Sequence, residues 1–207
     1  MNIKVERIGG TKKEVSGAFD ETEIYIGFVD DMLNLTEPLS FKGFLPNSSL
    51  ADSVFIKVNH TFKEGHRFTK IKAISESVSL ETTQIGVSTK SPIQQNKVEL
   101  KILGSSSQVL GFKRYITGRD LILIITEAGT KFKRQLGSRK QPCYLQETSS
   151  KIESAVEGEN ALTLKFLDKQ LYDAPFYLGD LSGLHEYFKS DNDIIKSDRT
   201  DVTSDLN

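Results

Sequence analysis

The sequence predicts a mainly β fold: an antiparallel β-sandwich or barrel-like domain with long loops and a short C-terminal helix or tail. Apolar and polar residues alternate with period two in several short segments, and clusters of turn-forming residues separate those segments. The chain has 207 residues, of which 37% are hydrophobic and 27% charged. It is therefore long enough to bury one self-sufficient core, and nothing about its length requires a second domain.

Four segments show the alternation most clearly. Their apolar faces are Ile24, Ile26 and Phe28; Val54, Ile56, Val58 and Phe62; Val98, Leu100 and Ile102; and Leu162, Leu164 and Phe166. In the last two segments the opposite face carries lysine, glutamate and threonine. This pattern is typical of antiparallel strands with one side in water.

The segment 68–80 changes its apolar phase near Ala73. A β-bulge at that point explains the change, because a bulge re-aims the side chains that follow it. A short helix is the competing interpretation, since Ile71, Ile74 and Val78 also fit helical spacing. The β-branched and serine-rich composition favours a strand.

The segment "LILIITEAGTKFKRQL" predicts a hairpin with two unlike strands. Leu121 to Ile125 lacks polar alternation, so we expect this strand to be covered on both faces, centrally in a sandwich or at a subunit interface. Gly129 is expected to supply a positive φ in the turn. In the returning strand Arg134 shares a face with apolar neighbours, so it must either extend its charged end into water or find a carboxylate, from its own chain or from another copy.

The chain is predicted to form one β-rich structural domain over residues 1–183, in which residues 30–53 are a candidate extended loop or arm. After Gly183 the composition changes, and residues 184–207 hold six acidic and three basic residues. The apolar residues there approximate helical spacing, which predicts a short amphipathic helix with a polar, acidic end.

No group of residues indicates catalysis, a metal or a cofactor, and we expect the protein not to be an enzyme. Cys143 is the only cysteine and is interpreted as a small buried side chain. His60 lies on the apolar phase of its segment and is interpreted as a core or edge histidine with satisfied hydrogen bonds, not as a metal ligand. Asp30 and Asp31 are assigned to a turn at a strand end, and "GSSSQVLG" at 104–111 to a loop.

The sequence shows neither a secretory signal nor an apolar run long enough for a membrane helix, so we expect no membrane partner. Its one concentrated electrostatic feature is a basic strip. From Lys113 to Lys140 there are eight lysines and arginines against two acids, although the net charge of the chain is −1. Such a strip could contact phosphates, and non-specific proximity to DNA stays open.

The favoured interpretation of the strip is a solvated hairpin that pairs with acidic surfaces, including those of another copy. The predicted subunit interface comprises Lys131, Lys133, Arg134, Arg139, Lys140, Leu184, Tyr187 and Phe188. Heterologous contacts of this kind between identical subunits close into rings or extend as tubes.

The order of an apolar strand, a turn, a returning strand and "LGSRKQPCYL", followed by "GENALTLKF" and "APFYLGD", resembles structural proteins of tailed bacteriophages. The resemblance covers residues 108–181. It implies a virion protein assembled in the host cytoplasm, of tail-tube type or from the neck or head-to-tail joining region. Its partners would be copies of itself and other virion structural proteins. The alternatives are a free β-sandwich module that binds a ligand or protein, and an enzyme with a scattered site.

Overall fold

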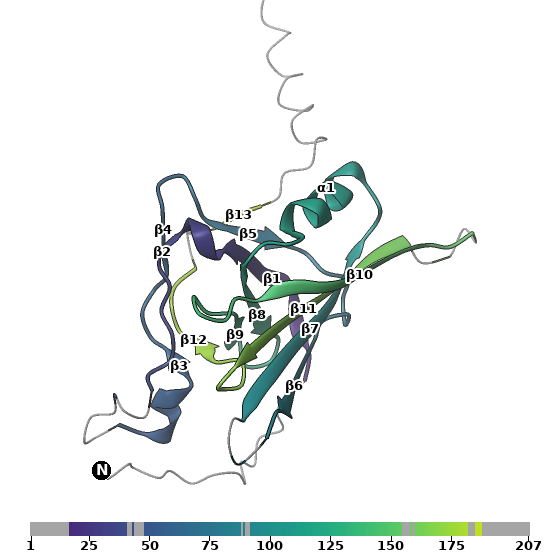
Figure 1. Cartoon of the computed structure of the whole chain (residues 1–207). Helices are drawn as coiled ribbons and strands as arrows, with labels where there is room; N and C mark the ends of the chain where they lie inside the picture. The colour runs from purple at the N-terminus through teal and green to yellow at the C-terminus, as the bar shows by residue number, and fades with distance from the viewer. Residues whose placement is uncertain are drawn as a thin grey trace, which may run out of the picture.

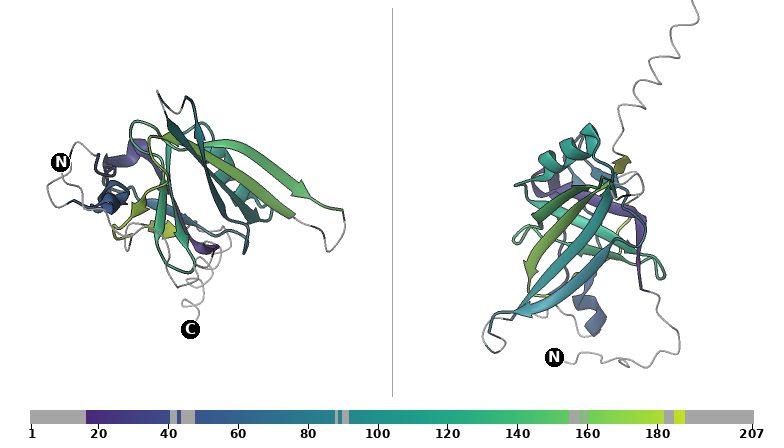
Figure 2. Two further views of the ribbon diagram at one scale, coloured as in Figure 1. Left: turned by 90° about the horizontal axis from the view of Figure 1, so that it is seen from below. Right: turned by 90° about the vertical axis from the view of Figure 1, so that its right-hand side faces the viewer.

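In a computed structural model, the structure describes residues 17–40, 43, 48–87, 89, 92–154, 158, 160–181 and 185–187. This part of the chain is mainly β, as predicted. Two sheets face each other, and a short helix lies at one end of the molecule (Figures 1 and 2). The predicted sandwich-like arrangement agrees with these two facing sheets.

The larger sheet has seven strands in the order β13-β5-β1-β8-β9-β12-β3. Their bounds are β1 (Phe19–Phe28), β3 (Phe55–Ile56), β5 (Phe68–Ile71), β8 (Leu121–Glu127), β9 (Lys133–Leu136), β12 (Phe176–Tyr177) and β13 (His185–Tyr187). Neighbours pair antiparallel except at the two ends, where β13 pairs parallel with β5 and β3 pairs parallel with β12. The sheet is therefore antiparallel in its centre and mixed at its edges.

The second sheet has four strands in the order β10-β11-β7-β6, and all its neighbours are antiparallel. The bounds are β6 (Ser79–Ile85), β7 (Ile93–Leu103), β10 (Tyr144–Ile152) and β11 (Asn160–Gln170). A two-stranded ribbon pairs β2 (Met32–Asn34) with β4 (Thr61–Phe62). Within the described ranges lie the helices η1 (Val29–Asp31), η3 (Leu50–Ser53) and α1 (Ser107–Ile116).

Strand β8 lies at the centre of the larger sheet and is covered on both faces. Leu121, Leu123 and Ile125 belong to the core between the two sheets, together with Leu164 of β11. Ile122 and Ile124 belong to a second apolar cluster on the opposite face. All five β8 residues are fully buried, so the expectation of a strand covered on both faces is confirmed, and the cover comes from the same chain.

Three of the four predicted alternating segments form strands with the predicted core face, namely β1, β7 and β11. The prediction for residues 54–62 was wrong in its extent. That segment contains only the two-residue strands β3 and β4, and these belong to different sheets. The turn between them accounts for Val58, which is more than half exposed.

The phase change near Ala73 has a different cause from the one predicted. Strand β5 ends at Ile71 in the larger sheet and β6 begins at Ser79 in the smaller one. The chain therefore crosses from one sheet to the other, and neither a bulge nor a helix forms there. A hydrogen bond from the Ala73 N–H to the Glu21 carbonyl, at 2.8 Å, fixes the start of the crossing.

Helix α1 replaces much of the loop that the sequence predicted at residues 104–111. Ser106 begins the helix, and its side chain accepts a hydrogen bond from the Val109 N–H at 3.3 Å. Phe112 and Ile116 lie one turn apart and are buried in the core. The serines that suggested a loop include Ser106, which caps the helix. Serine favours both loops and helix N-caps, and the prediction chose the loop.

Two further expectations need correction. Lys131, with φ of 58°, takes the left-handed conformation in the turn between β8 and β9, and Gly129 does not. Where an amphipathic helix was expected after Gly183, residues His185–Tyr187 form strand β13 beside β5. Leu184, Phe188 and the rest of the predicted tail lie outside the described residues.

The segment 30–53 was a candidate arm, but part of it packs on the body of the molecule. Met32 and Leu35 are buried in the second apolar cluster. Asp30 and Asp31 lie in η1 directly after β1, which confirms their assignment to a turn at a strand end.

Candidate functional site

Four of the five basic residues of the predicted interface bind groups of their own chain. Lys131 Nζ lies 2.8 Å from Asp20 Oδ2, and Lys133 Nζ donates to the Gly179 carbonyl at 3.1 Å. Arg139 donates to the Met32 carbonyl at 3.0 Å. Lys140 is exposed, as are Lys131 and Arg139, but no hydrogen bond or ion pair joins its side chain to another described residue. The interface role of all five residues stays a prediction.

Arg134 finds its carboxylate within the chain. Its Nε donates to Glu127 Oε1 at 2.7 Å, across the hairpin formed by β8 and β9. A second guanidinium nitrogen donates to the Ala174 carbonyl at 3.1 Å, and the guanidinium carbon lies 3.6 Å from the centre of the Phe176 ring. These contacts satisfy the charge that the sequence placed among apolar neighbours.

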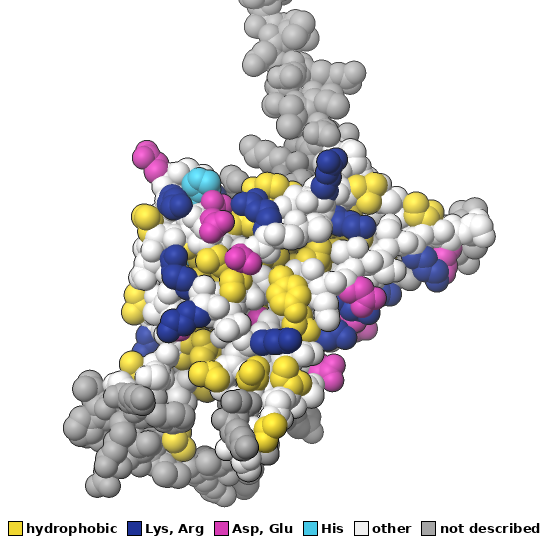
Figure 3. All heavy atoms as spheres, viewed as in Figure 1, with side chains coloured by type: hydrophobic (Ala, Val, Ile, Leu, Met, Phe, Trp, Pro, Cys, Tyr) yellow, Lys and Arg dark blue, Asp and Glu magenta, His cyan; other side chains and the backbone are white. Residues whose placement is uncertain are grey.

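Charges of both signs are interspersed on the face shown in Figure 3. On the outer side of the smaller sheet, Lys165 Nζ lies 3.0 Å from a carboxylate oxygen of Glu147 on β10 and 4.0 Å from one of Glu99 on β7. Hydrogen bonding to Glu147 raises the pKa of Lys165. These charged side chains are consistent with an outer face of the smaller sheet that lies in water.

His60 is a core residue, as the sequence predicted. Its Nδ1 accepts a hydrogen bond from the Thr36 N–H at 3.2 Å, so Nε2 carries the proton and donates to Gln135 Oε1 at 2.7 Å. The ring stacks on Tyr177 with 4.6 Å between centroids. Burial lowers the pKa of His60, which favours the neutral form that this hydrogen bonding requires.

Cys143 is fully buried and burial raises the pKa of its thiol, so the interpretation as a structural side chain is confirmed. Among the residues that the structure describes, no group of three His, Cys, Asp or Glu side chains is placed to hold a metal ion. None of the described helices is long and apolar enough to cross a membrane.

A buried polar cluster supports the loop that follows β9. Asp168 is 1% exposed and accepts hydrogen bonds from the Gly137 N–H at 2.6 Å and from Asn96 Nδ2 at 2.8 Å. Burial raises the pKa of Asp168, and these two donors oppose part of the rise. Gln170 donates to the Gln141 carbonyl at 2.7 Å. The cluster therefore fixes residues 137–141 against the end of β11.

This loop forms one wall of a groove of about 730 Å³. The other walls are the segment Glu37–Ser40, the end of η3, the start of β7 at Ile93 and the end of β11. Its apolar lining comprises Pro38, Leu39, Val54, Ile93, Leu171 and Tyr172, and its cations are Lys140 and Lys169. Leu171 is 81% exposed, so the groove offers an uncovered apolar surface flanked by positive charge.

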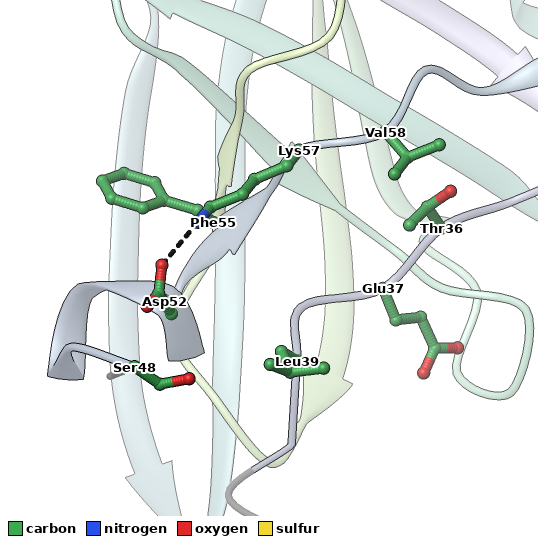
Figure 4. A pocket seen from close by; sticks show the side chains of 8 residues that line it. All are labelled: Thr36, Glu37, Leu39, Ser48, Asp52, Phe55, Lys57 and Val58. Carbon is green, nitrogen blue, oxygen red and sulfur yellow. Dashed lines mark hydrogen bonds and ion pairs between the residues drawn. The ribbon is translucent and has the colours of Figure 1, made fainter. Parts of the chain in front are cut away.

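A smaller cavity of about 440 Å³ shares Glu37 and Leu39 with the groove (Figure 4). Thr36, Glu37 and Leu39 line it from the segment, and Ser48, Asp52, Phe55, Lys57 and Val58 line it from η3, β3 and their flanks. An ion pair joins Lys57 Nζ to Asp52 Oδ1 at 2.5 Å, and hydrogen bonding to Lys57 lowers the pKa of Asp52. Glu37 is the third ionisable residue among those that line the cavity.

The smaller sheet has two open edges. Strand β10 has nine residues and β6 has seven, and within the described ranges no further strand pairs with the outer side of either. Strands β10 and β11 also extend beyond the body of the molecule (Figures 1 and 2). Unpaired edges of this length are templates for pairing with another chain.

Comparisons with known protein families, curated sequences and solved structures found no match. The candidate site therefore depends on geometry alone. Sequence reasoning singled out Lys140 but missed the groove and the edges, because their residues come from segments far apart in the chain. The exposure of Leu171 follows only from the fold, so the sequence held no local signal for the groove.

Proposed function

We propose that the protein is a non-enzymatic structural subunit that assembles with copies of itself into a ring or tube. The observation that carries the proposal is the pair of open edges, β10 and β6, on one four-stranded antiparallel sheet. The resemblance of residues 108–181 to structural proteins of tailed bacteriophages supports a virion as the setting. In that setting the subunit belongs to the tail tube or to the neck and head-to-tail joining region.

The strand directions favour head-to-tail pairing. Because every neighbouring pair in the sheet is antiparallel, β10 and β6 at its two edges run in opposite directions. A second copy placed beside the first in the same orientation therefore brings its β6 antiparallel to β10. Repetition of this contact continues one antiparallel sheet through successive copies, and a rotation at each step closes the series into a ring.

A register shift between Leu145 and Glu147 limits where β10 can pair. Such bulges bend an edge strand and interrupt its ladder. The pairing surface is therefore the part of β10 from Glu147 to Ile152. Its exposed side chains are short or charged from Glu147 to Lys151, and Ile152 adds one exposed apolar side chain at the end of the strand. A contact made mainly by backbone hydrogen bonds needs little more.

A cysteine scan tests the edge contact directly. Ser149→Cys on β10 is combined with a cysteine at Ser79, Glu81 or Thr83 on β6, which samples the register. Within one chain these edges are three strand spacings apart, about 14 Å, too far for a disulfide. Oxidation should therefore produce a ladder of covalent oligomers, and buried Cys143 should take no part.

The matched controls are the single-cysteine variants, which should stop at dimers. Light scattering of the unmodified protein across a concentration series gives the mass before oxidation. A strict monomer at high protein concentration, together with no ladder for any of the three pairs, would contradict the proposed assembly.

The second candidate function is a free β-sandwich module that binds a ligand or a protein. The groove of about 730 Å³, with its exposed Leu171, favours it. The two functions differ in solution: a binding module stays monomeric at all concentrations, whereas the structural subunit gains mass as concentration rises.

A further inference from the structure

The groove has the character of a binding site for an extended segment that is both apolar and acidic. Leu171 and Leu39 are 81% and 44% exposed, and Lys140 and Lys169 also line the groove. Glu37 is the one acid among its lining residues. A fitting occupant therefore carries branched aliphatic side chains next to carboxylates, so that it covers the leucines and meets the lysines.

The chain contains such a segment in residues 191–207. It holds five aspartates against Lys196 and Arg199, which is a net charge of −3 (two positive minus five negative). Ile194 and Ile195 follow Asp193 directly. Charge and apolar character in this segment thus complement those of the groove.

The positions of β13 and the groove point to contact between copies. β13, after which the segment follows, lies beside β5 near the α1 end of the molecule. The groove lies at the other end, beside η3 and the start of β7 at Ile93. β13 and the groove therefore lie at opposite ends of the molecule (Figures 1 and 2).

We propose that residues 191–207 of one copy bind in the groove of a second copy, with the isoleucines against Leu171 and Leu39 and the aspartates near Lys140 and Lys169. This contact joins copies end to end, along the strands of the smaller sheet, whereas the β10–β6 contact joins them side by side. The inference deepens the proposed function and rests on it, because both require copies of this chain to meet. Together the two contacts would stack rings into a tube.

Disulfide trapping between two full-length variants tests the contact. Leu171→Cys places a thiol in the groove and Ile195→Cys places one in the segment. The second variant carries an N-terminal size tag, so that mixed dimers can be distinguished on a gel. On oxidation of a mixture we expect mixed dimers to form at least tenfold faster than with Leu110→Cys, a control on α1 at the opposite end whose leucine is 44% exposed.

A second pair of measurements tests the chemistry. Reversing both charges with Lys140→Glu and Lys169→Glu should slow formation of mixed dimers by at least fivefold, and added salt should slow it in the unchanged pair. Mixed-dimer rates equal to those of the Leu110→Cys control would overturn the proposal. So would a double variant, Leu171→Cys with Ile195→Cys, that closes its disulfide within one chain at high dilution.

The two proposals fail separately. A ladder through β10 and β6 without trapping at Leu171 would refute the end-to-end contact and leave the side-by-side contact standing. Trapping at Leu171 without the ladder would refute the side-by-side contact instead.

Discussion

One added methyl group at Gly137 should destabilise the protein, and this residue begins the loop that forms a wall of the groove. Its φ is 89°, a conformation that residues with a Cβ adopt only at a cost. A Cβ added there would lie 2.6 Å from the Leu121 carbonyl oxygen and 2.8 Å from the Cys143 nitrogen. Both are backbone atoms, so neither can rotate away.

The expected cost follows from two contributions. The left-handed conformation of an alanine costs about 1 kcal/mol. The Leu121 and Cys143 backbones exchange hydrogen bonds of 2.8 and 2.9 Å, and separating them to admit the methyl group costs about 2–3 kcal/mol more. We therefore expect Gly137→Ala to lower the free energy of unfolding by about 3–4 kcal/mol.

Gly118 provides the matched control. Its φ is 74°, and an added Cβ would meet nothing within 4 Å. Gly118→Ala should therefore cost only the conformational contribution, about 1 kcal/mol. Urea unfolding of both variants, followed by circular dichroism with comparison of midpoints and slopes, measures the difference. Equal losses in the two variants would refute the close approach of the loop to β8.

Three further predictions concern ionisable groups. Burial raises the pKa of Asp168 above its ordinary 3.8. Between 3.8 and the raised pKa the folded state therefore binds more protons than the unfolded state. As the pH falls through that range, the wild type should gain stability relative to Asp168→Asn. Unfolding curves at several pH values measure this, and parallel pH profiles would contradict it. Cys143 should react with a thiol reagent only at the rate of unfolding, since its thiol is buried and its pKa raised; fast labelling of native protein would disprove its burial. Arg134→Glu should cost about 1–3 kcal/mol by opposing Glu127, while the mass in solution stays that of wild type. A selective loss of assembly in that variant, with stability retained, would restore the hairpin as the interface.

Much of the fold could be predicted from local pattern. Strands β1, β7 and β11 follow from side chains that alternate between core and water, and β8 follows from the absence of alternation. Helix α1 was missed because its sequence begins with a serine and glycine cluster that is equally typical of a loop. The crossing near Ala73 was missed because a phase change shows only that the apolar residues move to the other face of the segment. It does not show that the chain enters another sheet.

The candidate site was less accessible to prediction. Lys140 was singled out for its charge, but Leu39, Ile93 and Leu171 lie more than thirty positions apart and meet only in the folded chain. Arg134 was recognised as a residue that needs a carboxylate, and only the structure identified Glu127 as the partner. Contacts of this kind depend on which residues of two paired strands lie opposite each other. The alternation of side chains within one strand does not give this register.

The sequence by itself determined that this protein is mainly β, that Leu121 to Ile125 must be covered on both faces, and that Cys143 is a buried side chain. These properties follow from the cost of leaving apolar side chains in water, which acts residue by residue. Only the tertiary structure decided that Arg134 is satisfied within its own chain, that β10 and β6 are open edges among the described residues, and that a groove with two lysines lies at the end opposite β13. Those features depend on which strands become neighbours, and strand order is set by the packing of the whole domain.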